Sequence, residues 1–436
     1  MRILVLGSGG REHAICWALR KSKKQPLEIF CAPGNAGIAE IAECVPIAVG
    51  DQESLAGFAE SSSIDLTMVG PEAPLAEGIV DTFQARGLRI LGPSMDAARL
   101  EASKAFAKDF MRRHGIPTAR YRVVAPHEAE ETLKSGEFGT EDAPVVIKAD
   151  GLAAGKGVFV APDRAAALAA LNELKAGVVG GAAEQLVIEE ALSGREVSLL
   201  LFSDGQDFRL MPAARDHKRV GENNSGPNTG GMGCITDTTV LDDSMRDRIV
   251  REAVEPTLMG CRAEGFPFRG VLFLGLMLTD DGPRVLEYNV RFGDPETEAI
   301  LVRLETDLLE IFQSIAETRL GRLKINWTGG ASACVVLASR GYPAKAETGA
   351  RIEGLDRFGK HDDVTVFHAA TSRGPDHEWL TAGGRVLDIT ATGESLDLAL
   401  SRCYRAIADV HWEGMHYRRD IGVWRNSGSP LTASSV

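Results

Sequence analysis

A strand-like run followed by a glycine-rich turn contains the first residues that could do chemistry. The run is Val145–Lys148 and the turn is Ala149–Gly157, which contains Lys156. Strand alternation gives Lys148 a defined face, and glycines let the backbone approach phosphate oxygens closely. A Walker A loop is excluded, because three residues separate the glycines instead of four and Gly157 stands where that motif has a hydroxyl residue. An ordinary glycine-rich hairpin is the alternative.

Two residues that suit a metal ion stand on a second strand-like segment. Glu287 and Asn289 are two positions apart, so a strand would point both side chains to one face. Their carboxylate and amide oxygens are ligands that suit Mg²⁺. Arg291 follows on the same side if the strand continues, and Asp294 lies in the loop after it. A surface strand could combine Glu and Asn by chance, but the flanking apolar residues favour a cleft.

A third segment begins with charged residues and continues as a long glycine- and asparagine-rich loop. Asp216 and Lys218 stand at its start, and the loop runs to Gly233. Its length and glycine content predict a mobile cover over a site. A surface loop without a function is the alternative.

The N-terminal Gly7–Gly10 segment resembles part of a dinucleotide-binding turn, but the rest of that motif is missing. Glu12 stands where the third glycine of GxGxxG would fall, and the second strand ends at Cys31 and Ala32 without an acid for a ribose diol. NAD binding is therefore weakly supported. An anion site at a helix N-terminus remains a good interpretation.

The elements that must position these residues follow from apolar periodicity. Five short apolar runs in the first hundred residues predict strands buried on both faces, as in a parallel sheet whose ligands bind at the strands' carboxyl ends. These runs are Ile3–Leu6, Glu28–Cys31, Val45–Val49, Asp65–Val69 and Arg89–Leu91.

The later elements alternate between helices and strands. We expect a helix over 97–114 ending at Gly115, a compact strand–loop–strand–helix–strand unit over 144–190, a helix over 243–264, a hairpin of 270–279 with 284–289, and a strand-rich tail over 330–420.

Composition restricts the class of protein. The chain has 436 residues, a hydrophobic share of 44% and a formal net charge of −13. Such a charge argues against a nucleic-acid or anionic-membrane surface. The cysteine spacing matches no zinc pattern, and the N-terminal apolar run is too short for a signal peptide. We expect a monomeric cytoplasmic enzyme with buried thiols.

Taken together, these residues resemble the ATP-grasp superfamily and, within it, the phosphoribosylamine–glycine ligase family. The similarity covers nearly the whole chain, through LGSGGREHA, APGNAG, VGPEAPL, LEASKAFAKDF, VVIKADGLAAGKGV, VIEEAL, DHKRVGENNSGPNTGGMG, LEYNVRFGDPETE, GYP, GGRVL and RRDIG. The strings around Lys148, Asn228 and Asp294 are highly specific. One departure is Cys234–Thr236, where the family usually has an aromatic and small residues.

The resemblance implies a multidomain α/β and α+β fold. Residues 1–101 would form an N-terminal parallel-sheet, biotin-carboxylase-like domain that holds the amine substrate. Residues 102–328 would form the ATP-grasp core, with 120–192 covering the nucleotide. Residues 329–425 would form a small C-terminal α+β domain that completes the amine site, and 426–436 would be a tail.

The resemblance also implies roles for individual residues. Lys104 and Lys148 would contact the ATP phosphates, with Lys156 in the loop above them, and Glu287 and Asn289 would hold Mg²⁺ or Mn²⁺. The remaining implied roles are an adenine hinge at Glu189, Ala191 and Leu192, a ribose contact at Glu196, glycine contacts at Arg291 and Asp294, substrate-bordering positions at Asp216 and Lys218, and sugar-phosphate contacts at Gly9, Gly10 and Arg11.

The implied reaction is the second step of purine synthesis, in which ATP activates glycine as glycyl phosphate and the amine of 5-phosphoribosylamine displaces phosphate. A carboxylate resists attack by an amine because it is anionic and lacks a leaving group, and phosphorylation removes both obstacles. The alternatives are another ATP-grasp ligase, such as a purine-pathway formyl transferase or a bicarbonate-using carboxylase, and a non-catalytic nucleotide-sensing or NAD-binding module.

Overall fold

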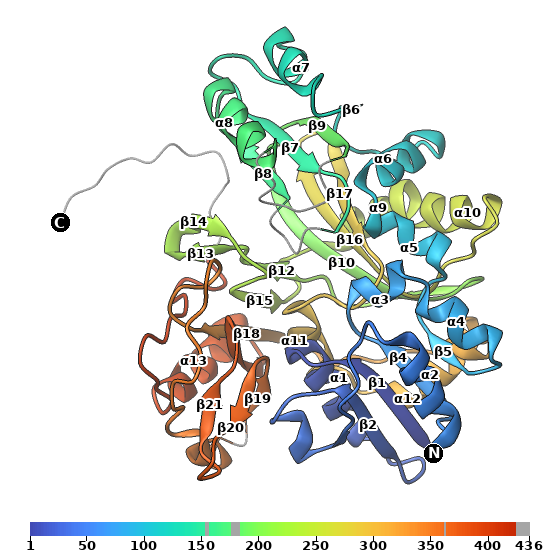
Figure 1. The fold of residues 1–436 in the computed structure, drawn as a ribbon, viewed down its shortest axis with the longest axis vertical. Helices are drawn as coiled ribbons and strands as arrows, with labels where there is room; N and C mark the ends of the chain where they lie inside the picture. The colour runs from blue at the N-terminus through green and yellow to red at the C-terminus, as the bar shows by residue number, and fades with distance from the viewer. Residues whose placement is uncertain (153–156, 176–183, 362, 424–436) are drawn as a thin grey trace.

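Short buried runs form a five-stranded parallel sheet at the N-terminus, as the sequence predicts. The computed structural model describes residues 1–152, 157–175, 184–361 and 363–423 (Figure 1). The sheet has the order β3-β2-β1-β4-β5 with every neighbouring pair parallel. Its strands are β1 (Arg2–Gly7), β2 (Glu28–Pro33), β3 (Glu43–Cys44), β4 (Leu66–Val69) and β5 (Ile90–Leu91).

The predicted strand over 45–49 is wrong, because the chain pairs with β2 two residues earlier, at Glu43 and Cys44, and leaves the sheet after Cys44. The helices of this unit are α1 (Gly10–Arg20), η1 (Ile38–Glu40), α2 (Gln52–Ser61), α3 (Glu72–Ala76) and α4 (Ile79–Ala85).

The helix predicted over 97–114 is two helices with a break at Ser103. They are α5 (Met95–Ala102) and α6 (Lys104–Arg113). Ser103 has extended backbone angles of φ −131° and ψ 113°, and its hydroxyl accepts a hydrogen bond from the Phe106 N–H, which caps α6. Gly115 ends the second helix with φ +66°, a conformation that glycine adopts readily.

A four-stranded antiparallel sheet of order β6-β9-β7-β8, called the covering sheet, forms a separate layer at the end of the molecule opposite the N-terminal sheet (Figure 1). It has its own core, which includes Ile147, Leu171 and Ile188. The predicted succession of elements over 144–190 is confirmed. The elements are β6 (Tyr121–Val124), α7 (Ala129–Ser135), β7 (Val145–Ala149), β8 (Val158–Ala161), α8 (Arg164–Lys175) and β9 (Leu186–Glu190).

A second four-stranded antiparallel sheet, of order β11-β10-β16-β17, lies beneath that layer and is called the central sheet. Its strands are β10 (Arg195–Asp204), β11 (Phe208–Leu210), β16 (Arg269–Thr279) and β17 (Gly282–Asn289), so the predicted hairpin is confirmed. The predicted helix over 243–264 is α9 (Asp243–Ile249), the π-helical η4 (Val250–Val254) and α10 (Glu255–Ala263) in succession, and α11 (Glu296–Leu301), α12 (Leu308–Ala316) and η5 (Leu320–Arg322) follow β17.

The C-terminal segment forms an α+β unit whose sheet includes two strands from much earlier in the chain. The sheet order is β12-β15-β18-β22-β19, all antiparallel. The elements are β12 (Arg215–Asp216), β15 (Gly233–Thr236), β18 (Ala331–Ala338), η6 (Leu355–Lys360), β19 (Val364–His368), β22 (Arg385–Gly393) and α13 (Leu396–Ile407), with a small pair of β20 (Thr371–Arg373) and β21 (Trp379–Thr381).

The loop predicted over 216–233 is partly ordered structure. It contains β13 (Arg219–Gly221), η3 (Glu222–Asn224) and β14 (Ser225–Asn228), and β13 pairs with β14 in an antiparallel hairpin. The hairpin is fastened to the C-terminal unit, because buried Arg418 donates to the Arg219 carbonyl at 3.0 Å and to the Asn224 side chain at 3.2 Å.

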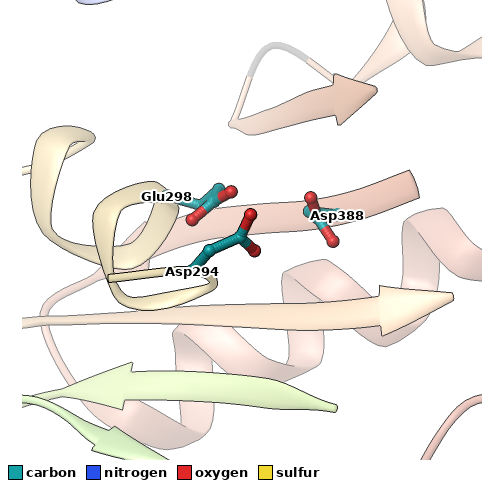
Figure 2. A group of neighbouring side chains, drawn as sticks. All are labelled: Asp294, Glu298 and Asp388. Carbon is teal, nitrogen blue, oxygen red and sulfur yellow. The ribbon is translucent and has the colours of Figure 1, made fainter. Parts of the chain in front are cut away.

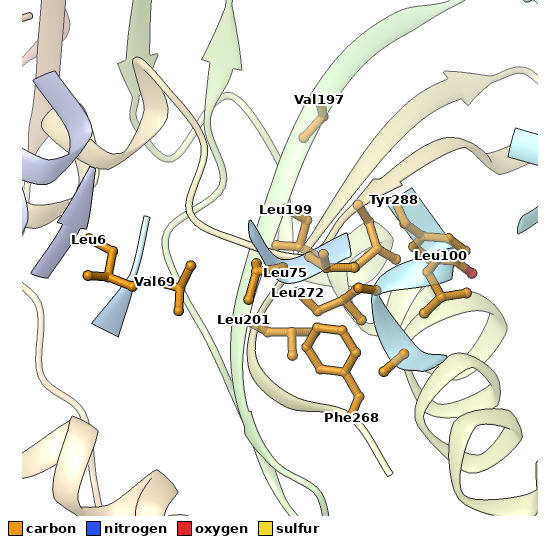
Figure 3. Packing of buried hydrophobic residues seen from close by; sticks show 14 of the residues in the cluster. Leu6, Val69, Leu75, Leu100, Val197, Leu199, Leu201, Phe268, Leu272 and Tyr288 are labelled. Carbon is orange, nitrogen blue, oxygen red and sulfur yellow. The ribbon is translucent and has the colours of Figure 1, made fainter. Parts of the chain in front are cut away.

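Apolar packing joins the units. One buried cluster runs from Leu6 and Val69 in the N-terminal sheet to Leu199 and Leu272 in the central sheet (Figure 3). The same cluster continues to residues of the C-terminal unit such as Trp412. Burying such side chains is the main favourable contribution to folding. Among the described residues, none of the helices combines the length and the apolar character that crossing a bilayer requires.

Candidate functional site

Lys148 lies where the covering sheet meets the central sheet. It stands on β7, and its ammonium group donates to the Leu286 carbonyl of β17 at 3.1 Å. The same group lies 3.0 Å from the Glu189 carboxylate on β9, and both side chains are buried. Lys148 therefore lies between the two sheets, with its ammonium group against β17.

Lys104 approaches the glycine-rich turn from a different element. The break at Ser103 makes Lys104 the first residue of α6, and its ammonium group donates to the Gly151 carbonyl at 2.8 Å. Asp150 fixes this junction by accepting hydrogen bonds from the Ser103 hydroxyl and the Ala105 N–H, each at 3.1 Å. Burial and the nearby Lys148 charge lower the pKa of Lys104, with Glu287 opposing them. Lys156 lies outside the described residues.

Glu287 and Asn289 share one face of β17, as predicted. Tyr288 between them points the other way and is buried, whereas Glu287 is about one-third exposed, at 37% of its side chain. Burial would raise the pKa of Glu287, but the charges of Lys218, Lys148, Lys104 and Arg291 outweigh it, and the pKa is lowered. An ionised carboxylate surrounded by basic side chains is a suitable setting for a metal ion bound together with phosphate groups.

Lys218 lies between the carboxylates of Glu287 and Glu196. Its ammonium group is 3.7 Å from the Glu287 carboxylate and 3.5 Å from that of Glu196, and these charges raise its pKa. Glu196 is exposed near the start of β10. Asp216 is the last residue of β12, and burial and the neighbouring Glu296 carboxylate raise its pKa.

Arg291 connects β17 to the N-terminal unit. Its guanidinium contacts the Glu72 carboxylate at 3.2 Å and the Glu101 carboxylate at 2.9 Å, and it donates to the Asn289 side-chain oxygen at 2.9 Å. Glu72 begins α3, immediately after the carboxyl end of β4. Arg291, a predicted site residue, therefore contacts side chains both on β17 and in the N-terminal unit.

Three carboxylates, Asp294, Glu298 and Asp388, lie close together (Figure 2). One oxygen from each lies within 4.8 Å of the others. Glu298 and Asp388 lie against Gly10, the first residue of α1. Arg385 forms an ion pair with Asp294 at 3.0 Å. Within the part of the chain that the structure describes, the side-chain oxygens of Glu298 and Asp388 have no hydrogen-bond partner, although both residues are fully buried.

Burial and mutual repulsion dominate the chemistry of this acidic cluster, defined as Asp294, Glu298 and Asp388. Burial and the Asp294 charge raise the pKa of Asp388 to about 8, and burial with both neighbouring carboxylates raises that of Glu298. Unpartnered buried carboxylates favour protons or a ligand rich in hydrogen-bond donors.

The predicted sugar-phosphate residues lie beside this cluster. A Cβ added at Gly10 would meet the Asp388 and Glu298 oxygens, and one added at Gly9 would meet Glu12. Arg11 is buried, its guanidinium pairs with the Glu12 carboxylate at 2.6 Å, and it also donates to the Phe292 carbonyl at 3.1 Å.

The remaining predicted residues occupy the end of the covering sheet. Glu189 lies on β9, and Ala191 and Leu192 follow it at intermediate exposure. The Glu189 side chain is 1% exposed and lies between two lysines, so its carboxylate does not face solvent.

The segment Cys234–Thr236, which departs from the family pattern, lies on β15 and is buried in the C-terminal sheet.

Sequence reasoning missed Lys108, Glu298, Arg385 and Asp388. Lys108 lies one helical turn after Lys104 on α6. Because residues four positions apart are neighbours on a helix, the predicted helix could have indicated that Lys108 lies near Lys104. Glu298 and Asp388 come together only through folding, because 90 positions separate them in the sequence.

The chain matches three family models along nearly its whole length. They are described as the N domain of phosphoribosylglycinamide synthetase over residues 1–101, its ATP-grasp (A) domain over 102–297 and its C domain over 332–424. The three models follow one another along the chain in that order.

Curated relatives and solved structures agree with the models. The chain is 45% identical over 429 residues to the phosphoribosylamine–glycine ligase of Xylella fastidiosa strain Temecula1, covering 98% of both chains. It is 45% identical over 434 residues to that of Escherichia coli K12, again covering 98% of both.

The crystal structure of phosphoribosylamine–glycine ligase from Thermotoga maritima aligns with a TM-score of 0.82 at 36% identity, covering 96% of this chain and 100% of that one. A biotin carboxylase from Campylobacter jejuni aligns with a TM-score of 0.69 at 18% identity, covering 95% of this chain and 92% of the other, which shows a shared fold. With family models matching all three units and relatives at 45% identity over 98% of its length, the chain belongs to the phosphoribosylglycinamide synthetase family of ATP-grasp proteins.

Proposed function

We propose that this chain catalyses the ATP-dependent ligation of glycine to 5-phosphoribosylamine, giving glycinamide ribonucleotide, ADP and phosphate, the second step of purine synthesis. The observation that carries the proposal is the convergence of Lys104, Lys148, Lys218 and Arg291 around Glu287, between two sheets. Such a set of basic side chains around one ionised carboxylate suits a nucleoside triphosphate and its metal ion. The relatives named phosphoribosylamine–glycine ligase match this chain over 98% of its length.

The residues present fit a divalent cation, Mg²⁺ or Mn²⁺. Glu287 supplies an ionised carboxylate and Asn289 an amide oxygen on the same face of β17, and both side chains are partly exposed. When bound, the cation would offset charge on the transferring phosphoryl group. Lys104 and Lys148 would bind the phosphates, and Lys156 would lie above them.

The nucleotide base and sugar would lie along the end of β9. We assign the adenine contacts to Glu189, Ala191 and Leu192, and the ribose contact to Glu196. Because the Glu189 carboxylate is buried between lysines, its contribution to the adenine contact would come from its backbone.

Glycine would lie beside Arg291, whose guanidinium suits a carboxylate. Its carboxylate would attack the γ-phosphorus of ATP, and the glycyl phosphate formed would be attacked by the amine of 5-phosphoribosylamine. Asp216 and Lys218 would border the two substrates. The covering layer would exclude the water that otherwise hydrolyses an acyl phosphate.

We propose that Asp294 and the rest of the acidic cluster accept hydrogen bonds from the amines and hydroxyl groups of the substrates. Gly9, Gly10 and Arg11 would meet the sugar phosphate of 5-phosphoribosylamine, with the Arg11 guanidinium also paired to Glu12. We further propose the domain limits 1–101, 102–328 and 329–425, a tail from 426 to 436, a monomer and a cytoplasmic location.

The test is ADP formation by the purified chain. Turnover is expected only when glycine and 5-phosphoribosylamine are both present, and a panel of other carboxylates with ATP should give none. Glycine labelled with ¹⁸O in its carboxylate should transfer one label to the phosphate released. Turnover with bicarbonate or formate, or phosphate without label, would reject the proposal.

A further inference from the structure

Glu189 lies between two buried lysines from different elements. One carboxylate oxygen is 3.0 Å from the ammonium group of Lys108 on α6, and the other is 3.0 Å from that of Lys148 on β7. The exposed fractions of the three side chains are 2% for Lys108, 1% for Glu189 and 7% for Lys148. Three charged groups therefore share a site that water barely reaches.

Both lysines are anchored to the same strand of the central sheet. The Lys108 ammonium donates to the Thr118 hydroxyl at 2.7 Å, and that hydroxyl donates to the Val285 carbonyl at 2.6 Å. The Lys148 ammonium donates to the Leu286 carbonyl at 3.1 Å. The network thus ends on two consecutive carbonyls of β17, directly before Glu287, and fixes the covering layer to the strand that carries the proposed metal ligands.

The charge of this network explains why it has two lysines. A buried Lys148–Glu189 pair alone would be neutral, and its carboxylate would hold the ammonium group that is proposed to face phosphate. With Lys108 present, one negative charge is shared between two positive charges, so the network keeps a net positive charge. Burial and Lys148 lower the pKa of Lys108 to about 8, with Glu189 opposing them, so most Lys108 remains protonated at neutral pH.

We propose that Lys108 is a positioning residue for phosphoryl transfer. By sharing Glu189, it leaves Lys148 a positive charge for the phosphates of ATP and holds the Lys148 ammonium group against β17. Lys108 acts through Glu189 and is too buried to contact nucleotide itself. This inference rests on the proposed function, because it requires ATP phosphates to lie against Lys148.

The alternative is that the buried ion pair only stabilises the fold, and a double-mutant cycle that neutralises the charges one at a time separates the two roles. Lys108→Met leaves Glu189 to neutralise Lys148, so the dissociation constant for ATP should rise about tenfold or more. Glu189→Gln removes the neutralising carboxylate, and the double variant Lys108→Met with Glu189→Gln leaves Lys148 charged. The double variant should therefore bind ATP within about threefold of the unmodified chain, although its turnover stays low.

The measurements are ATP binding by calorimetry, turnover, and the midpoint of thermal unfolding, all on the full chain. Lys134→Met is the matched control, since Lys134 forms an exposed pair with Glu130 on α7 of the same layer; it should change none of them. Recovery of ATP affinity in the double variant supports the positioning role. ATP affinity that follows thermal stability through all variants, without recovery, overturns it.

If Lys108→Met does not fold, Lys108→Arg supplies the test. The charge is kept but the guanidinium is larger, so ATP affinity should stay within about threefold while turnover falls at least tenfold. Unchanged turnover in Lys108→Arg would reject the positioning role. Failure of the unmodified chain to bind ATP would instead reject the proposed function, so the two failures are distinguishable.

Discussion

The guanidinium of Arg291 donates a hydrogen bond of 2.9 Å to the side-chain oxygen of Asn289, the same oxygen that is proposed to bind a divalent cation. A metal ion bound by Asn289 would therefore compete with Arg291 for one ligand atom. Arg291 also pairs with Glu72 and Glu101, so it has other partners when Asn289 turns to a metal. Metal binding at Asn289 would then be coupled, through this contact, to the placement of the proposed glycine-binding residue.

Arg291→Met should separate metal binding from activity. With the competing cation removed, Mn²⁺ affinity in the presence of ADP should rise about threefold to tenfold. Turnover with glycine should fall at least about 100-fold, because the proposed carboxylate contact is lost. Paramagnetic resonance of bound Mn²⁺ and an ADP-release assay measure the two effects. Weaker Mn²⁺ binding would show that Arg291 supports the metal site instead of competing with it.

Glu287→Ala should weaken metal binding and activity together. At ordinary Mg²⁺ concentrations we expect turnover to fall about 100-fold or more, with partial recovery when Mg²⁺ is raised. Glu53→Ala, on the exposed surface of α2, is the control. Unchanged turnover of the Glu287 variant would remove this residue from the metal role.

Asp388→Asn should stabilise the fold at neutral and alkaline pH. The pKa of Asp388 is raised from 3.8 to about 8, so the stability that its protonated form contributes is complete below about pH 4 and is lost as pH rises through 8. Asn does not titrate, and the variant's free energy of unfolding should exceed that of the unmodified chain by about 1 kcal/mol or more at pH 8. Urea unfolding at pH 5 and pH 8 measures this gain, which should be larger at pH 8.

The matched control for that experiment is Asp397→Asn on the exposed start of α13. A gain that is equal at both pH values, or absent at pH 8, would contradict a raised pKa at Asp388.

His13→Asn should reduce the sensitivity of the fold to acid. The ring nitrogen Nδ1 of His13 accepts a hydrogen bond from the His368 N–H at 2.8 Å, and burial lowers the pKa of His13 from 6.5 to about 4. Its contribution to stability is therefore present above pH 6.5 and is lost as pH falls through 4. Asn offers an acceptor without titrating, so the loss of unfolding free energy between pH 7.5 and pH 5 should shrink by about 2 kcal/mol.

Denaturant unfolding at the two pH values checks this, with the exposed His127→Asn as control. An equal acid sensitivity in both variants would show that His13 does not titrate with unfolding.

The broad fold was predictable because strong local patterns specify it. Buried runs such as Ile3–Leu6, the turn at Asp280–Gly282 and the stop at Gly115 all act within a few residues, and the structure has each of them. The break at Ser103 was missed because the surrounding sequence keeps helical periodicity. The carboxylate of Asp150, 47 positions away, stabilises that break by accepting from the Ser103 hydroxyl.

The proposed site was predictable to the extent that it lies within short motifs. Lys148, Glu287 and Asn289 could be assigned to faces of strands from spacing alone. The partners that set their charge could not, because Lys108 and Glu189 are 81 positions apart and meet only after α6 and β9 pack together. The acidic cluster was missed for the same reason, since it joins α11 to β22.

The shared C-terminal sheet has a consequence for anyone who divides this protein. β15 pairs with β18 through four residue positions, from Gly233 opposite Val335 to Thr236 opposite Ser332. A fragment that starts near residue 330 would expose the backbone hydrogen-bonding groups along one edge of β18, and a fragment that stops there would expose those of β15. Either piece would be prone to pair with other copies of itself through this edge, and we expect both halves, in one polypeptide or co-expressed, to be more soluble than either alone.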